Sequence, residues 1–525
     1  MYDGADSLSV SSNEKLKSII KRFHSHNNTR DGWIETWQDC YNYAMPNRTG
    51  FYSHVPGQRN TDLIFDSTAV IAVQEFASRM QAGLTPPFAK WFELQAGSEV
   101  PKERKSEVNR ILEDIALYAW EVLQASNLDQ ELHEGYVDLT LGTGALLVEE
   151  GDAINPIKFT AIPQTQLVLG EGPFGKIDPV YRTREMTLEN IQVTWPKASI
   201  PDKMHREASD KPDRSFKILE CLKRDWKSKG TERYTFDVVC IEPEHLIFES
   251  EFKGDGSLPV IPFRWSKAAG EIYGRGPLLN SLPDVKTLNM TVELVLQNAE
   301  IAVAGMWQGD DDGTINPDTI ELVPGSIIPR SPGSKGLEPL LAPGKFDVGQ
   351  FILEDMRHTV KKALFNESLG APEGTPMSAT EVHERMADLA RTIGSAYGRL
   401  HTELVTPLLR RVLYILKKQG RINIPLVNGR EVKVINVSPL AQAQHNENVA
   451  RVARTGELMN AIFGPQITGL VLKAEEVGAY IGSEIGVPDK LLRNDAEREE
   501  MAQAIAETAQ QSQEQNGDMG GLLGG

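Results

Sequence analysis

Residues 377–411 read MSATEVHERMADLARTIGSAYGRLHTELVTPLLRR and carry the most regular apolar pattern in the chain. Ser378 and Glu381 have the spacing of a capping box, which marks the start of a helix. Apolar residues then recur every three or four positions, with one gap, as on one face of a helix. They are Val382, Met386, Leu389, Ile393, Leu400, Leu404, Leu408, Val412 and Leu416. The pattern predicts a helix of roughly 40 residues, about 60 Å long, that Pro407 kinks and Gly420 ends.

Two further helices are predicted before this stretch, on either side of a turn-rich excursion. The first covers 273–304 and the second 347–365. Between them, residues 306–345 contain six Pro and six Gly, which predicts a compact excursion of strands and turns. The helix breakers in NESLGAPEGTPM, residues 366–377, predict an exposed loop before the long helix. A helix of such length next to these elements favours an elongated architecture.

The N-terminal part of the chain is predicted to be helical. Ser11 and Glu14 form a second capping box, and the helix that they open ends before Pro46. Asp66 is predicted to be the N-cap of the next helix. A third helix is predicted over 102–125.

From 145 to 262 the sequence changes to short β-prone runs separated by Gly, Pro and Asp. The runs are ALLVEE, QLVLG, VYRTREMT, FKILECL, YTFDVVCI and HLIFESEF, with a helix expected near 187–195. After the long helix, a strand EVKVINV precedes helices that continue to about 514, and the tail is expected to be disordered. Helical and β-rich stretches in separate blocks predict an α+β fold.

Length and charge limit the classes of function. The 525 residues exceed the usual length of one domain severalfold, so two or more packed units are expected. The 55 Lys and Arg against 73 Asp and Glu give a net charge of −18. This charge disfavours a protein that wraps nucleic acid by neutralising phosphates.

The cysteines and the apolar segments indicate the cellular setting. Cys40, Cys221 and Cys240 lie too far apart in sequence for a zinc knuckle or a disulfide framework, which predicts a reducing environment. The first residues have no secretory signal pattern. The most apolar segment, 288–307, is interrupted by acidic and amide side chains, so no membrane-spanning helix is expected.

The motif nearest to a phosphate-binding loop is incomplete. In Gly170-x-x-x-x-Gly175-Lys176, Ile177 stands where magnesium binding needs Ser or Thr, and a strand-like run follows instead of a helix. A hairpin turn is therefore predicted. Gly142-x-Gly144 lacks the third glycine of a dinucleotide-binding fingerprint and also predicts a turn.

Metal and nucleophile motifs are incomplete as well. The pairs that begin at His133 and His383 lack the second His of a zinc protease helix. The acidic run from Asp310 lacks the ligand and the Gly that a calcium loop requires. With no nucleophile motif either, the sequence predicts no enzyme, no metal site and no cofactor.

Two patterns near the long helix allow two interpretations each. Its apolar stripe is either core within its own subunit or surface that an assembly buries. A basic cluster near its end either complements the helix dipole or contacts DNA. The cluster consists of Arg410, Arg411, Lys417, Lys418 and Arg421.

The order helix, excursion, helix, loop and very long helix resembles the portal, or head-to-tail connector, proteins of tailed bacteriophages, particularly short-tailed ones. Four stretches carry the resemblance in family order: FDSTAVIAVQEFASRMQAGLTPPFAKWFEL (65–94), YGRGPLLNSLPDVKTLN (273–289), the stretch 377–411 and VSPLAQAQ (437–444). The resemblance covers about residues 10 to 500. None of the four stretches is catalytic.

The resemblance implies an elongated portal fold with a helical stem, a β-rich wing insert, a clip, a long wing-to-crown helix and a helical crown. The implied parts are the wing 1–272, stem helix 273–304, clip 305–346, stem helix 347–365, tunnel loop 366–378, long wing helix 379–422, crown 423–510 and disordered tail 511–525.

The resemblance also implies a dodecameric ring at one capsid vertex of the virion, assembled in the host cytoplasm. Double-stranded DNA would pass through its channel during packaging and ejection. The implied partners are the terminase, the major capsid and scaffolding proteins, and tail adaptor proteins, with no membrane and no cofactor. The net negative charge suits this role, because an acidic wall does not hold DNA by counterion release.

The resemblance places the tunnel loop at the narrowest part of the channel. Its hinge residues are Gly370, Pro372, Gly374 and Pro376, and its acidic residues Glu367 and Glu373 would repel phosphate. Lys361 and Lys362, one turn before the loop, are expected either to touch passing DNA or to lie on a solvated or intersubunit salt-bridged face. Trp307 of the clip is either an apolar anchor for the motor and tail or packed within its own clip.

Two other classes of protein stay open on the sequence. One is a packaging enzyme, an ATPase or nuclease, which the incomplete phosphate loop disfavours. The other is a different ring-forming head-tail adaptor, which the length of the chain disfavours.

Overall fold

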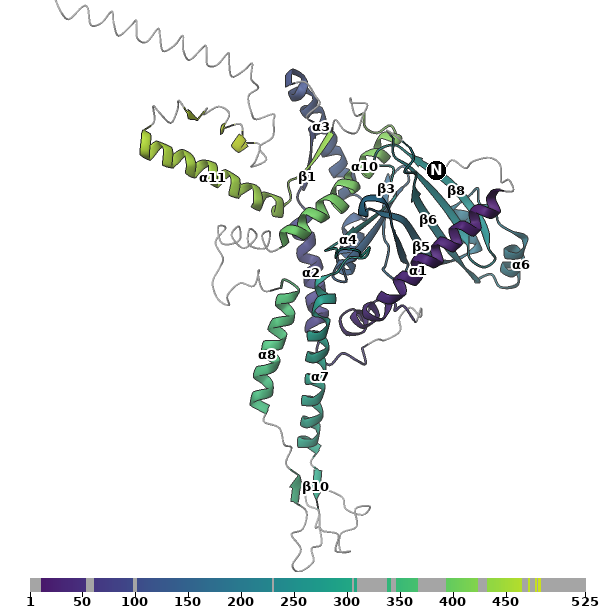
Figure 1. Cartoon of the computed structure of the whole chain (residues 1–525), viewed down its shortest axis with the longest axis vertical. Helices are drawn as coiled ribbons and strands as arrows, with labels where there is room; N and C mark the ends of the chain where they lie inside the picture. The colour runs from purple at the N-terminus through teal and green to yellow at the C-terminus, as the bar shows by residue number, and fades with distance from the viewer. Residues whose placement is uncertain are drawn as a thin grey trace, which may run out of the picture. The chain divides into compact units, whose positions relative to one another are not determined.

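The computed structural model describes residues 11–52, 61–97, 102–228, 231–304, 306–308, 338–340, 346–366, 393–423 and 432–464, with 471–472, 477–478 and 480–482. The chain divides into two compact units (Figure 1). The helical unit consists of Gly32–Phe76 and Pro277–Glu367, and the sheet unit consists of Met1–Asp31, Ala77–Gly276 and Ser368–Gly525. The described elements confirm the predicted mixture of helices and sheets, and all the sheets are antiparallel.

The largest sheet has five strands that are neighbours in chain order. They are β4 (Leu167–Glu171), β5 (Ile177–Thr187), β6 (Ser215–Arg224), β7 (Arg233–Cys240) and β8 (His245–Lys253). Each strand coincides with one of the predicted β-prone runs. The predicted helix near 187–195 is α5 (Leu188–Thr194), and a second short helix, α6 (Asp202–Asp210), was not predicted.

Helix α1 (Ser11–Ala44) covers one face of this sheet with its first part (Figure 1). Its apolar residues Leu16, Ile19, Ile20 and Phe23 have helical spacing and pack on strand residues that include Tyr181 and Leu219. The ammonium group of Lys15 forms ion pairs with Asp237 at 2.5 Å and with Glu249. The helix lies where the sequence predicts it.

A three-stranded sheet of order β3-β2-β9 lies in the same unit. Its strands are β2 (Thr143–Glu150), β3 (Ile157–Ala161) and β9 (Val260–Arg264); the sequence predicted only β2. Two helices, α3 (Lys102–Gln124) and α4 (Leu128–Leu139), precede it, whereas the sequence predicted one helix there. A two-stranded sheet joins β1 (Phe92–Ala96) to β12 (Val432–Asn436), and helix α11 (Pro439–Phe463) follows β12.

The long helix is described from residue 393, so its predicted first part, 377–392, lies outside the described residues. Residues 393–400 are helical, and a π-helical turn, η2 (His401–Val405), leads into α10 (Thr406–Lys418). The Thr406 N–H donates to the carbonyl of His401, five residues back. The wider turn accommodates Pro407, which has no N–H to donate and would crowd a regular α-helix.

The predicted end of this helix at Gly420 is confirmed. Gly420 has a φ of 70°, its N–H donates to Lys417, and the Arg421 N–H donates back to Leu416. This is a Schellman motif, which needs a left-handed residue and therefore favours glycine. The described residues of the apolar stripe, from Ile393 to Leu416, are buried within the chain, so the interpretation as core of its own subunit is confirmed there.

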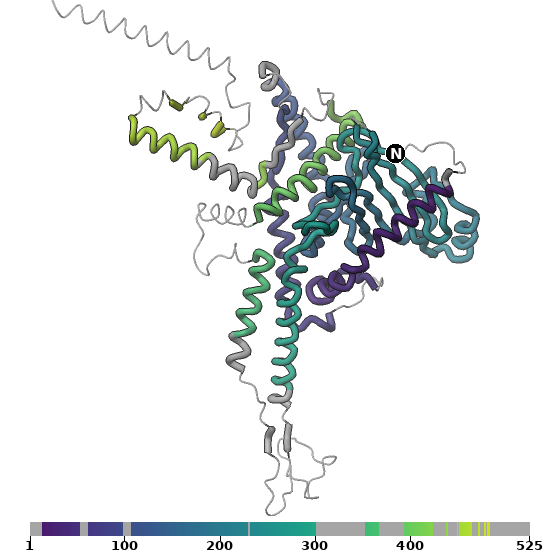
Figure 2. The backbone as a smooth tube through the Cα atoms, viewed as in Figure 1, coloured from purple at the N-terminus to yellow at the C-terminus, as the bar shows by residue number. Residues whose placement is uncertain are grey.

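The helical unit is built around α7 (Pro277–Ala304) and α8 (Phe346–Ala363), which lie side by side (Figure 2). Both confirm predicted helices. Short strands β10 (Met306–Gln308) and β11 (Glu338–Leu340) pair antiparallel within the predicted excursion. Helix α2 (Thr68–Leu84) begins in this unit. None of the helices in the described part of the chain is long and apolar enough to cross a membrane.

Three glycines let two backbone segments cross in the sheet unit. A Cβ on Gly142 would lie 2.2 Å from the carbonyl oxygen of Gly274, and one on Gly276 would lie 2.0 Å from that of Thr140. The close approach of the two segments allows hydrogen bonds between them. The Gly274 N–H donates to Thr143 Oγ1 at 2.8 Å, and the Gly276 N–H donates to the carbonyl of Leu141 at 3.0 Å. The crossing explains Gly142 of the predicted turn and both glycines of the YGRG stretch.

We expect Gly142→Ala to destabilise the sheet unit by at least about 3 kcal/mol, because it combines a backbone clash with a φ of 126°. Gly270→Ala is the matched control, since Gly270 has a φ of 82° but no atom within 4 Å of an added Cβ. That control should cost only about 1 kcal/mol. Denaturant unfolding measures both, and equal losses would contradict the role of the crossing.

Candidate functional site

Helix α8 of the helical unit is amphipathic. Leu353, Val360 and Leu364 are buried and follow each other at seven and four positions, which places them on one face. The opposite side is exposed and mostly polar, although it includes Ile352, which is 41% exposed. Its polar members are Glu354, Asp355, His358, Thr359, Lys361 and Lys362. A polar helix face of this kind stays in contact with water.

Asp66 connects the start of α2 to α8. Its Oδ1 accepts a hydrogen bond at 2.8 Å from the N–H of Thr68, the first residue of α2. Its Oδ2 accepts from Arg357 of α8, at 2.9 Å from Nε and 2.8 Å from a terminal nitrogen. The sequence predicted the cap, although α2 begins two residues after Asp66. It did not predict the arginine.

Asn289 connects the same point to α7. Its Oδ1 accepts hydrogen bonds from the backbone N–H groups of Phe65 and Asp66, at 3.0 and 3.1 Å. Its Nδ2 donates to the carbonyl of Val285 at 3.0 Å, so the oxygen and the nitrogen of this buried amide each have a partner. Asp66 and Asn289 together fix three helices of the unit to one another.

The environment of Asp66 keeps its carboxylate charged. Burial by itself raises the pKa of a carboxyl group, but the hydrogen bonds from Thr68 and the charge of Arg357 favour the ionised form. The balance lowers the pKa of Asp66 below its usual value. The ion pair with Arg357 is therefore present at neutral pH.

The end of α8 is held against α2. Phe365 has a φ of 60°, which is rare for an aromatic residue, and its ring lies 6.4 Å from that of Phe76. The Asn366 N–H donates to the carbonyl of Lys361, and its side-chain amide donates to that of Ala72 at 3.3 Å. Asn366 is buried, whereas the sequence placed it in the exposed loop. An exposed loop can begin only after this residue.

The residues predicted to line the channel are described only in part. Lys361 and Lys362 lie in the last turn of α8, are exposed, and form no ion pair with the residues that the structure describes. The other predicted residues of the tunnel loop, Glu367, Gly370, Pro372, Glu373, Gly374 and Pro376, lie outside the described residues. Trp307 lies in β10 opposite Pro339 of β11.

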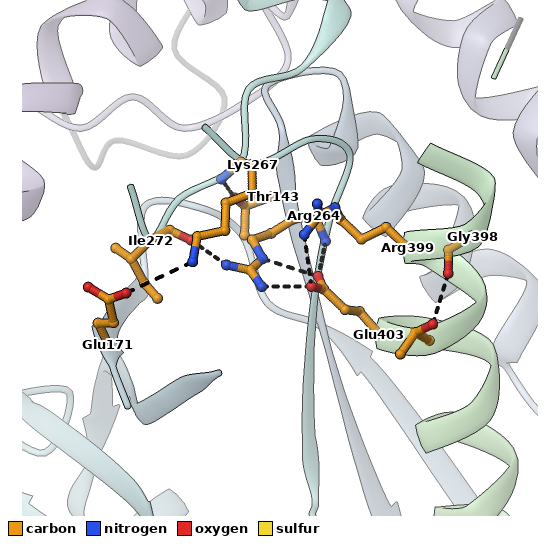
Figure 3. Close-up of polar contacts among 10 residues, drawn as sticks. Thr143, Glu171, Arg264, Lys267, Ile272, Gly398, Arg399 and Glu403 are labelled. Carbon is orange, nitrogen blue, oxygen red and sulfur yellow. Dashed lines mark hydrogen bonds and ion pairs between the residues drawn. The ribbon is translucent and has the colours of Figure 1, made fainter. Parts of the chain in front are cut away.

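A partly buried ion pair between Arg264 and Glu403 holds the long helix in the sheet unit (Figure 3). Arg264 of β9 donates to Glu403 from Nε at 3.1 Å and from a terminal nitrogen at 2.6 Å, and its other terminal nitrogen donates to Ile272 at 3.1 Å. Arg399 adds a contact to Glu403 at 3.4 Å. Paired in this way the charges stabilise the packing. No sequence signal identified Glu403, since it occupies a polar flank of the apolar stripe.

The basic cluster at the end of the long helix binds the β-rich part of the same unit. Arg411 is 3% exposed and donates to the carbonyls of Val148 and Ser257. Lys418 pairs with Glu150 at 2.7 Å, Arg421 donates to Ala153 at 2.7 Å, and Arg410 lies 3.7 Å from Asp255. The DNA-contact interpretation is wrong for Arg411, because burial removes it from any nucleic acid.

The phosphate-loop candidate is a turn, as the sequence predicts. The residues from Gly170 to Lys176 connect antiparallel β4 and β5, and Gly175 has a φ of 67°. In the candidate dinucleotide-binding fingerprint, Gly142 lies in a turn, but Gly144 belongs to β2. His133 lies 3.2 Å from Gln81 Oε1. Among the described residues, no group of three or more His, Cys, Asp and Glu side chains is placed to hold a metal ion.

Comparison with known proteins identifies the class of this chain as a structural component of tailed phages. The "Probable portal protein" of Bordetella phage BPP-1 is 23% identical over 455 residues, which cover 82% of this chain and 80% of that protein. The "Portal protein" of Escherichia phage T7 is 20% identical over 424 residues, 77% and 75% of the two chains. The family model described as bacteriophage head to tail connecting protein matches residues 16–492.

The chain belongs to the bacteriophage head to tail connecting protein family. This confirms the resemblance found in the sequence and assigns the protein to the head-tail connection of a phage particle. A solved structure of the virion of a native gene transfer agent particle overlaps the chain with a TM-score of 0.35 and 11% identity. That overlap covers 79% of this chain and 89% of the other. The match of the family model over residues 16–492 establishes the family.

We expect Asp66→Asn to destabilise the helical unit by roughly 1 kcal/mol at pH 7, because the amide keeps a cap acceptor but loses the charge that pairs with the partly exposed Arg357. A carboxylate with a lowered pKa contributes stability above its unfolded pKa and loses it as the pH falls through the folded value. The difference from wild type should therefore shrink below about pH 4.

Denaturant unfolding at pH 7 and pH 3 measures this effect. Asp62→Asn is the matched control, since Asp62 is exposed and lies just before the same helix. A loss of equal size in the control, or one that does not depend on pH, would contradict the ion pair.

Proposed function

We propose that this protein is the portal of a tailed phage: a dodecameric ring at one capsid vertex through which double-stranded DNA is packaged and ejected. The observation that carries the proposal is the family match over residues 16–492. The role is structural, without catalysis or a cofactor. The ring assembles in the host cytoplasm and becomes part of the virion.

The proposed parts follow the family layout. The stem consists of 273–304 and 347–365, the clip of 305–346, and the tunnel loop of 366–378. The wing is 1–272, the long wing helix 379–422, and the crown 423–510. The antiparallel pair α7 and α8, with β10 and β11 paired between them, supports the stem and clip assignments.

The proposed channel wall includes the exposed face of α8 and the tunnel loop. Lys361 and Lys362 are free to touch phosphates as DNA passes, while Glu367 and Glu373 repel them. Two lysines per subunit on an acidic chain release few counterions, so the DNA stays mobile. Gly370, Pro372, Gly374 and Pro376 act as hinge points of the loop.

The proposed partners bind at the two ends of the ring and around it. The terminase docks on the clip during packaging and tail adaptor proteins replace it afterwards, because a turn-rich excursion between two helices is a natural binding surface. The major capsid and scaffolding proteins contact the ring at the vertex.

Measurement of the mass of the purified protein tests the ring, and images viewed down the particle axis give its symmetry. A dodecamer is expected. A protein that stays monomeric at high concentration, with no ring in the particle, would overturn the proposed function.

We expect deletion of residues 368–376 to leave ring assembly intact but to reduce the retention or the final length of the packaged DNA. Substitution of both Lys361 and Lys362 by Ala should weaken retention less, because the loop would remain in place. Pulsed-field electrophoresis of DNA from purified particles measures the packaged length. If the deletion particles hold full-length genomes stably, the assignment of the loop to the channel is wrong.

We expect Trp307→Ala to leave the ring folded but to impair docking of the motor or tail, because Trp residues often supply much of the binding energy of an interface. Counts of filled and tailed particles measure the effect. Trp265→Ala, a buried Trp of the sheet unit, serves as a control for a general loss of stability. Normal yields of complete particles with Trp307→Ala would contradict the role of Trp307 as an anchor for the motor or tail.

A further inference from the structure

Helix α7 is apolar on two opposite sides. Val285, Leu288 and Val292 are buried within the helical unit. On the other side, Met290 is 65% exposed and Leu294 is 53% exposed. Four residues with spacings of four, three and four form a continuous row on this exposed side: Pro283, Thr287, Met290 and Leu294, here called the α7 stripe.

The α7 stripe requires a cover that the described part of the chain does not supply. Neighbouring apolar side chains that are exposed on a helix often mark an interaction site, whereas the exposed residues of α8 next to it are mostly polar. The stripe also contains no charged side chain. The two helices of the pair therefore have different surroundings in the working particle.

Three further exposed apolar side chains belong to the same unit. Leu63 is 48% exposed, Phe65 is 40% exposed and Ile71 is 53% exposed. These three residues, which precede α2 or lie in its first turns, are here called the α2 patch. Two different apolar surfaces on one unit are what a heterologous contact between identical copies needs.

The α7 stripe and the α2 patch lie at the same height along α7. The N–H of Phe65 donates to Asn289, which directly precedes Met290 in the stripe. Successive residues of a helix point about 100° apart, so Asn289 and Met290 face different directions at this level. The unit thus presents one apolar surface toward each of two directions.

We propose that the α7 stripe of one copy packs on the α2 patch of the next copy in the ring. The inference rests on the proposed function, since it assumes a ring with α7 along its axis. Rotation about that axis leaves the height of every residue unchanged. Each α7 stripe therefore meets the neighbour's α2 patch at the level where Phe65 is bonded to Asn289.

The area of the two surfaces suits such a contact. The five large apolar side chains of the stripe and the patch measure about 200 Å² each and are about half exposed, which gives on the order of 500 Å² of apolar surface. A stable interface buries about 1,600 Å² in total, with an apolar centre and a polar rim. The stripe and patch have the size of that centre.

Cross-linking between two single-cysteine variants tests the contact. Met290→Cys and Phe65→Cys are coexpressed, assembled and mildly oxidised. Each chain carries one new thiol, so a disulfide can form only between copies, and covalent dimers are expected in the mixture. The three native cysteines are buried, and burial raises the pKa of the Cys40 thiol to about 12, so they do not compete.

The controls separate the possible outcomes. Val193→Cys in place of Phe65→Cys should give no dimer, since Val193 is 74% exposed but belongs to the sheet unit. Dimers from Met290→Cys alone would show a symmetric contact and overturn the proposal. Rings that form without cross-links would overturn this surface but leave the proposed function standing. Absence of rings in wild type would overturn both.

A disruptive variant provides an independent measurement. Met290→Glu with Leu294→Glu should raise the concentration needed for ring assembly at least about tenfold, because two charges would have to be buried in the contact. Circular dichroism should show unchanged helix content, and Val193→Glu should assemble as wild type. Normal assembly of the double variant would also overturn the proposal.

Discussion

The hydrogen-bonded carboxylate of Asp66 is the interaction on which the arrangement of the helical unit depends. A buried carboxylate is costly unless its oxygens are paired, and here one oxygen caps α2 while the other binds Arg357 of α8. The backbone N–H of the same residue is bound by Asn289 of α7. One residue therefore determines how three helices meet, and it does so with directional bonds that permit little sliding.

The sheet unit is also held together by charged side chains that form hydrogen bonds between its elements. Arg264 and Glu403 join β9 to the π-helical turn of the long helix, and Arg411 of α10 binds carbonyls of the β-rich part. Arg264 and Arg411 are buried, Glu403 is partly buried, and each of the three has its partners. A long helix held at several points by such bonds cannot rotate about its axis without leaving charges unpaired.

The exposed surfaces of α7 and α8 differ in polarity. The exposed face of α8 is mostly polar and carries Lys361 and Lys362, whereas one exposed side of α7 carries the apolar residues Met290 and Leu294. In a ring, one kind of surface suits water and moving DNA, and the other suits a neighbouring copy.

The sequence alone determined the elements whose signals are local. The helices α1, α7 and α8, the five strands of the large sheet, the hairpin at Gly175 and the helix end at Gly420 all follow from periodicity, breakers and turn chemistry within a few residues. The resemblance to the family also follows from the sequence, because it depends on the order of such stretches along the chain. Only the tertiary structure decided the short strands β1, β3 and β9, because a strand such as β1 is stabilised by β12, far along the chain. It also decided that Asn289 supports α2, that Arg411 is buried rather than available to DNA, and that Pro407 is absorbed by a π-turn. Each of these depends on a partner brought close by folding, which no local pattern contains.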